Sequence, residues 1–121
     1  MSAVALGSGN SNVSCTDGIK GSPCGTAVWH WDAESTQTSD QCSTDVFVNS
    51  IGVVRKDDTM ISHPDGTPCT SSAINHAPAL STYSSTVFVN GKNIGRVGDK
   101  YDSDSHYDHT ISTGSNNVFS G

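Results

Sequence analysis

The chain has few of the residues that build an ordinary hydrophobic core. Of its 121 residues, 33% are hydrophobic and 7% are aromatic. A chain with so little apolar surface to bury stays disordered, or it needs a staple such as a metal ion, a disulfide or a partner. Short apolar segments alternate with polar residues, which argues against disorder. We therefore expect a stapled fold.

Positive charge is scarce as well. Six Lys and Arg stand against twelve Asp and Glu, for a net charge of −6, so the chain has no basic stripe for nucleic acid. No apolar run approaches the length of a membrane span. Residues 1–6 are too short and too uncharged for a signal peptide, which predicts synthesis in the cytoplasm. The length predicts one domain over residues 1–121.

Helix signals are nearly absent, because no segment sustains a 3.6-residue apolar period. Short strand-like segments recur instead, and they predict an all-β fold. They lie at residues 3–6, 46–48, 53–55, 87–89, 94–97 and 118–119.

One phrase occurs twice. Residues 46–58 read VFVNSIGVVRKDD and residues 87–99 read VFVNGKNIGRVGD, with six of the thirteen positions identical. Asn90-Gly91 favours a tight hairpin turn between two strands of the second copy. Residues 49–52 predict a looser turn in the first copy. Within VFV, the two valines point one way and the phenylalanine the other.

Partial copies of the phrase occur at both ends of the chain. A serine stands shortly before a valine at Ser43, Ser85 and Ser115, and again at Ser11. Residues 114–121, GSNNVFSG, begin another copy of the phrase, and residues 9–13 resemble a degenerate one. Units that cannot bury a face alone must stack or wrap around each other.

A histidine-bearing loop follows each full copy. His63 and His76 follow the first, and His106 and His109 follow the second. Such loops on a small β scaffold predict a metal clamp.

Four cysteines, Cys15, Cys24, Cys42 and Cys69, fit no zinc-finger spacing and allow two disulfides in three pairings. In a reducing cytoplasm we expect Cys15, Cys24 and Cys42 to be thiols without chemistry.

Residues 14–42 do not fit the repeat and predict a long loop or β-excursion. Trp29 and Trp31 flank His30 there. The segment is either a hairpin that covers one flank of the core or a contact surface for a partner.

The repeated phrase, above all residues 87–99, resembles the PAAR-repeat family over residues 43–121. Members of that family cap the central spike of contractile phage tails and type VI secretion systems. The resemblance implies a small conical β fold made of short hairpins. Its base would sit as a monomer on a trimeric β-helical spike protein. Near its tip, three His and one Cys would hold a metal, usually zinc, with iron as the alternative.

Carried over residue by residue, the resemblance implies a metal site made of His63, His76 and either His106 or His109, with Cys69 as the thiol. A set of histidines alone, with both His106 and His109, is the rival. The second loop departs from the family pattern, because it contains no Cys.

The function implied by the resemblance is structural. The protein would be a tip that helps to pierce the target cell envelope at the distal end of a virion tail spike. The stand-alone length and the closing TGSNNVFSG favour a phage tail. A type VI secretion adaptor with non-covalent cargo is the alternative. We do not expect an enzyme: a zinc hydrolase lacks support because the chain has neither HExxH nor a nucleophile elbow. A small secreted disulfide domain would contain Cys15–Cys24 or a similar bridge and no metal.

Overall fold

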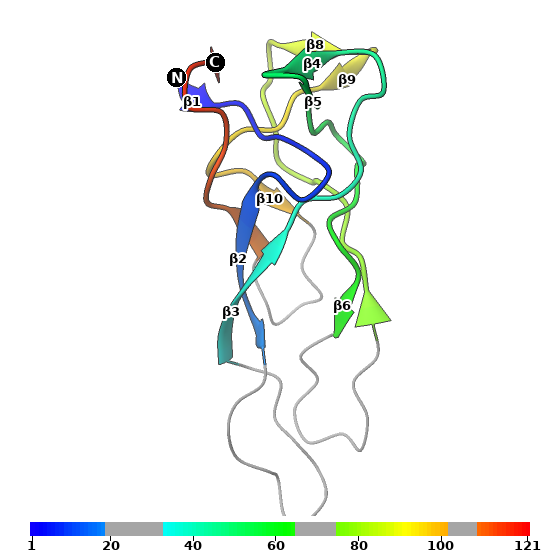
Figure 1. Cartoon of the computed structure of the whole chain (residues 1–121), viewed down its shortest axis with the longest axis vertical. Coiled ribbons are helices and arrows are strands. Elements are labelled where there is room, and N and C mark those ends of the chain that lie inside the picture. Colours follow the sequence, from blue (N-terminus) through cyan, green and yellow to red (C-terminus); the bar gives the residue numbers. More distant parts are fainter. Residues whose placement is uncertain (19–32, 65–74, 102–108) are drawn as a thin grey trace, which may run out of the picture.

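The computed structural model describes residues 1–18, 33–64, 75–101 and 109–121 (Figure 1). Every regular element in these ranges is a short β-strand, and all pairs are antiparallel, which confirms the predicted all-β class. None of these residues forms a helix that could cross a membrane. The strands are β1 (Ser2–Ala3), β2 (Asn12–Gly18), β3 (Ala33–Thr38), β4 (Phe47–Val48), β5 (Ile51–Gly52), β6 (His63–Pro64), β7 (Asn75–His76), β8 (Phe88–Val89), β9 (Lys92–Asn93), β10 (Lys100–Tyr101), β11 (His109–Ile111) and β12 (Phe119–Ser120).

The repeated phrase forms two equivalent hairpins, β4–β5 and β8–β9. Phe47 pairs with Gly52, and Phe88 pairs with Asn93. Both turns contain two residues, and Asn49 and Asn90 have φ near +55°. The first turn is thus as tight as the second, which corrects the expected looser turn. The second strands lie at Ile51–Gly52 and Lys92–Asn93, earlier than residues 53–55 and 94–97.

A third hairpin is assembled from the two ends of the chain. In β12 and β1, Phe119 pairs with Ala3 and Ser120 with Ser2. This register repeats that of β4–β5 and β8–β9, so the partial copy at residues 114–121 continues in space into the first residues of the chain. Figure 1 shows the three hairpins gathered at one end of the molecule, which we call the base.

A closed ring of backbone hydrogen bonds relates the three units by a pseudo-threefold axis. The amide of Ala5 donates to the carbonyl of Gly95 (3.0 Å), Gly95 donates to Val54 (2.8 Å), and Val54 donates back to Ala5 (3.0 Å). Three isolated bridges surround this ring in the same cyclic order, at Val4↔Arg96, Leu6↔Val53 and Arg55↔Ile94. Each unit therefore binds both of the others.

A serine before each base hairpin plays the same structural role in all three units. The hydroxyl oxygens of Ser43, Ser84 and Ser115 accept the amides of Val46, Val87 and Val118 at 2.9–3.0 Å, and all three serines are buried. The member before Val87 is Ser84, one residue earlier than the Ser85 of the predicted phrase. These turns fix the entry into each base hairpin.

Bidentate ion pairs close the next turn in two of the units. Arg55 pairs with Asp58 and Arg96 with Asp99, each with Nε–Oδ2 distances near 3 Å, and each carboxylate also accepts the arginine's own amide. The neighbouring carboxylate raises the pKa of each arginine. In the third unit Leu6 replaces the arginine, and its amide donates to the hydroxyl of Ser11.

Beyond the ring, the chain extends away from the base in three arms (Figure 1). One arm is β6–β7; the other two, β10–β11 and β2–β3, join in one sheet of order β10-β11-β2-β3. Within the predicted excursion of residues 14–42, residues 14–18 and 33–38 belong to the paired strands β2 and β3, while Trp29, His30 and Trp31 lie outside the described residues. A core of Ala5, Val13, Val54, Met60, Leu80, Tyr101 and Ile111 fills the space between the arms.

A substitution at Gly52 tests how closely the base hairpin β4–β5 is packed. A Cβ at this position would overlap the carbonyl oxygen of Ser43 and lie 2.7 Å from Cys42 Sγ. Gly52→Ala should therefore lower the free energy of unfolding by about 2 kcal/mol or more. Ser50→Gly should raise it by about 0.5 kcal/mol, because Ser50 has φ 65°. Urea unfolding measures both; a neutral Gly52→Ala would contradict the packing.

Tyr101 should make the fold sensitive to alkali. Burial raises the pKa of its phenol, helped by the nearby carboxylate of Asp58, and the hydroxyl has no hydrogen-bond partner among the described residues. Above the ordinary pKa near 10, the unfolded chain loses this proton before the folded chain does. The free energy of unfolding should then fall by up to about 1.4 kcal/mol per pH unit. Urea unfolding at pH 9 and pH 11 should show this fall in the parent and not in Tyr101→Phe; an equal fall in both proteins would contradict it.

Candidate metal centre

Three histidine side chains converge where the arms leave the core. His63 on β6 pairs across the hairpin with His76 on β7, and His109 begins β11 on a neighbouring arm. The Nε2 atom of His63 lies 2.9 Å from that of His76 and 3.1 Å from that of His109. His63 and His109 are buried, and His76 is half-buried.

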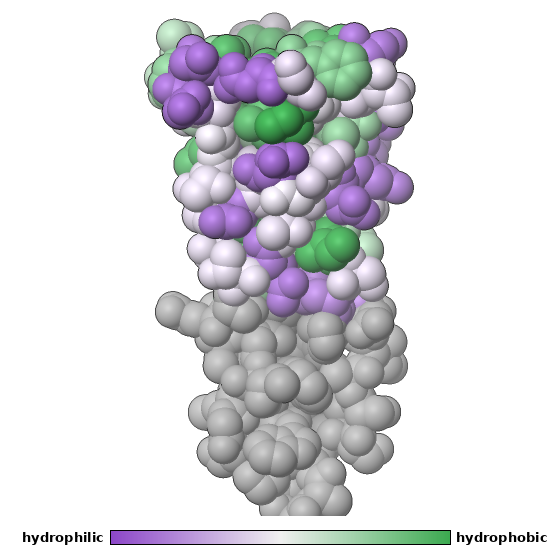
Figure 2. All heavy atoms as spheres, in the orientation of Figure 1, coloured by the Kyte–Doolittle hydropathy of each residue, from purple (hydrophilic) through white to green (hydrophobic). Residues whose placement is uncertain are grey.

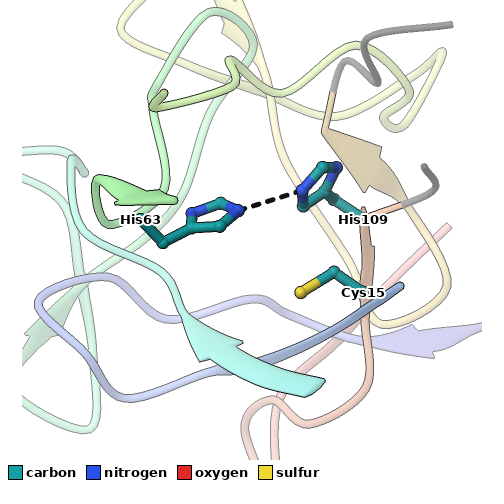
Figure 3. A group of neighbouring side chains, drawn as sticks. All are labelled: Cys15, His63 and His109. Carbon is teal, nitrogen blue, oxygen red and sulfur yellow. Dashed lines mark hydrogen bonds between the residues drawn. The ribbon is translucent and has the colours of Figure 1, made fainter. Parts of the chain in front are cut away.

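A thiol from the third arm completes the group. Cys15 on β2 lies directly across from His109 in the sheet. The ligand atoms of Cys15, His63 and His109 all lie within 4.8 Å of one another, and all three side chains are buried (Figure 3). The group therefore draws its donors from all three arms.

The hydrogen bonding of His63 prepares its ring for a cation. Its Nδ1 lies 2.9 Å from the carbonyl oxygen of Ile61, which can only accept, so Nδ1 carries the proton. The Nε2 atom of His63 then presents a lone pair toward two other imidazole nitrogens. A cation between the rings would bind the Nε2 atoms of all three histidines. Such a backbone carbonyl partner is typical of metal-bound histidine.

The two nitrogen–nitrogen distances at His63 are close to those around a small tetrahedral ion. Zinc–nitrogen bonds near 2.0–2.1 Å imply nitrogen–nitrogen separations of about 3.3 Å in a tetrahedron. The observed separations of 2.9 and 3.1 Å need to open by only a few tenths of an ångström. The residues present can therefore hold a metal ion, and an ion there would tie the three arms to one another.

Of the five ligands expected from the sequence, His63 and His109 lie in the group with Cys15, and His76 lies beside it with its Nε2 atom 2.9 Å from that of His63. Cys69 and His106 lie outside the described residues. Asp58 and Asp99, which precede the two histidine loops, belong to ion pairs with arginine and take no part in the group.

Sequence reasoning assigned Cys15 no role, and the structure places it among the donors. Cys15 is distant from the histidines in the sequence and belongs to none of the full repeats. The available signal was alternation: Ser11, Val13 and Cys15 are buried, while Asn12 and Ser14 are exposed. This pattern marks the inward face of β2.

Comparison with known proteins gave no match to any family model, curated protein or solved structure.

Metal analysis tests the donor set. We expect the purified protein to bind one divalent ion per chain by elemental mass spectrometry, and His63→Ala and Cys15→Ser to lose it on dialysis. Chelation should lower the melting temperature, because ligand at 100 times its Kd stabilises the folded state by about 2.7 kcal/mol.

Two serine variants serve as matched controls. Cys42→Ser should keep the ion, because Cys42 packs against Gly7 and Gly52 rather than against the histidines. Retention of the ion in Cys69→Ser is measured beside its loss in Cys15→Ser, because the resemblance implies Cys69 as the thiol ligand. Retention of the ion in Cys15→Ser would contradict the assignment of Cys15 as a donor.

Proposed function

We propose that this protein is a PAAR-like structural tip, which caps the trimeric β-helical spike of a contractile injection machine. The observation that carries the proposal is the threefold base. Phe47, Phe88 and Phe119 occupy equivalent positions in its three hairpins and are 56%, 57% and 51% exposed.

Apolar exposure is concentrated at the base. The exposed large hydrophobic side chains of the described residues are Met1, Val46, Phe47, Ile61, Phe88, Val118 and Phe119, and only Ile61 lies away from the base hairpins. In Figure 2 hydrophobic residues lie among polar ones at the upper end, which is the base. Exposed apolar patches of this kind are typical of protein interfaces.

The symmetry of the base supports a partner with threefold symmetry. A surface that presents the same hydrophobic contact three times around an axis matches an assembly of three identical chains. A second copy of this chain would have to bring three exposed phenylalanines against three others. A trimer that ends in three equivalent pockets receives each phenylalanine once.

The metal centre supports the same role at the opposite end of the core. The donor set of three His and one Cys is the set that the resemblance implies, with Cys15 as the thiol, and zinc suits it. His76 as a fourth donor, with its Nε2 atom 2.9 Å from that of His63, would leave no open position for substrate, so the ion would be structural. The protein is then a mechanical element, which helps to pierce the target envelope from the end of a phage tail spike. A bacterial secretion spike is the alternative setting.

Substitutions at the base test the proposal. Phe47→Ser, Phe88→Ser and Phe119→Ser should each weaken binding to the trimeric spike protein of the same apparatus by about tenfold or more, because each removes one of three buried contacts. The melting temperature should change little, since all three rings are more than half exposed. Calorimetric titration measures the affinity.

Ile61→Ser is the matched control for these variants. Ile61 is an exposed apolar residue away from the base, and this variant should bind as the parent does. Equal binding by all four variants would overturn the proposal.

A further inference from the structure

Each base hairpin has two outer edges, and one of them is already bonded within the molecule. This closed edge belongs to the second strand of each hairpin, which is β5, β9 or β1. Its main-chain carbonyl accepts an amide from a neighbouring unit at 2.8 Å, with Gly7 donating to Gly52, Lys56 to Asn93 and Val97 to Ala3. The second strands therefore join the hairpins to the rest of the fold.

The first strands, β4, β8 and β12, present the opposite edge. The valine before each phenylalanine accepts an amide across its own hairpin at 3.0–3.3 Å, with Val53 donating to Val46, Ile94 to Val87 and Val4 to Val118. Hydrogen-bonded and non-hydrogen-bonded pairs alternate along an antiparallel ladder. The pair that contains the phenylalanine is therefore non-hydrogen-bonded. The N–H and C=O groups of Phe47, Phe88 and Phe119 thus point away from their own hairpins.

These three edges are open among the described residues. No described residue forms a hydrogen bond with the outward main-chain groups of Phe47, Phe88 or Phe119. Edge strands are commonly protected by a lysine, a proline or a bulge, and β4, β8 and β12 contain none of these. Figure 1 shows β4 and β8 at the outer end of the base, and both lie in the interior of the sequence.

The open main-chain groups belong to the same residues as the exposed rings. A partner that covers the rings of Phe47, Phe88 and Phe119, which are all more than half exposed, also removes the adjacent N–H and C=O groups from water. Buried main-chain groups are almost always paired, because an unpaired group loses its hydrogen bond to water and gains none in return. The partner must therefore supply a carbonyl and an amide at each site, and an extended segment supplies both.

We propose that β4, β8 and β12 each receive an extended segment from one chain of the spike trimer, which adds to the hairpin as a further strand. The identity of the partner rests on the proposed function. Because the three edges offer the same groups around the pseudo-threefold axis, three identical chains can bond to them in the same way. The main-chain bonds hold each segment, and the phenylalanine ring fixes its position along the edge.

Amide hydrogen exchange of the free protein tests the edges without any partner. The amides of Phe47 and Phe88 should exchange within about tenfold of the unfolded-chain rate. Those of Val53 and Ile94, which donate within the same hairpins, should exchange at least about 100 times more slowly. Equal protection of all four amides would overturn the proposal. So would protection of Phe47 and Phe88 that grows with protein concentration, because the edges would then pair with a second copy of this chain.

An ester bond in place of the Phe88 amide tests strand addition itself. Phenyllactic acid at this position removes the N–H and keeps the ring, and it should weaken binding to the trimer about fivefold, as expected for one lost hydrogen bond. Slow exchange of the Ile94 amide in this variant verifies that the hairpin is intact. The matched control is an ester in place of the Gly91 amide, to which no described residue bonds, and it should bind as the parent does.

The outcomes separate strand addition from the proposed function. Parent-like binding by the Phe88 ester, with weakened binding by Phe88→Ser, would overturn strand addition and leave a contact made by the ring alone. Equal weakening by the Phe88 and Gly91 esters would also overturn it. Failure of the parent to bind any trimer would instead overturn the proposed function, while hydrogen exchange of the free protein would still report whether the edges are open.

Discussion

The structure depends on the closed triangle of backbone hydrogen bonds among Ala5, Val54 and Gly95. Each of the three residues donates to one neighbour and accepts from the other, so no unit can leave without breaking two bonds. Backbone groups can make this ring from any sequence that fits the space. That is why the three units share a geometry although the third keeps little of the repeated phrase. A chain with a small apolar core gains order from this ring that burial alone would not give.

The two ends of the molecule use the triangle in different ways. At the base, the three hairpins follow the pseudo-threefold symmetry of the triangle, and each exposes one phenylalanine. Along the arms the symmetry is lost: one arm contributes two histidines, the second a histidine and the third a cysteine. A tetrahedral ion needs four donors, which three equal arms cannot supply as one each. The candidate donor group therefore lies where the symmetry of the base is lost.

Much of the base could be predicted from the sequence. The repeated phrase located two hairpins, Asn90-Gly91 located one turn, and alternation placed the phenylalanine of each VFV on the opposite side from its two valines. The third hairpin could not be recognised, because its strands lie at opposite ends of the chain and pair Phe119 with Ala3. Cys15 was missed for a related reason: its place across from His109 follows from sheet register, which the sequence does not state.

The central claim is that a base of pseudo-threefold symmetry binds three identical chains. Native mass spectrometry of this protein mixed with the trimeric β-helical spike protein that the proposal names as its partner tests it most directly. The account predicts a single complex that contains one copy of this protein and three spike chains. No complex should contain more than one copy of this protein per trimer. A complex of equal numbers of tip and spike chains, or a tip that assembles only with itself, would contradict it.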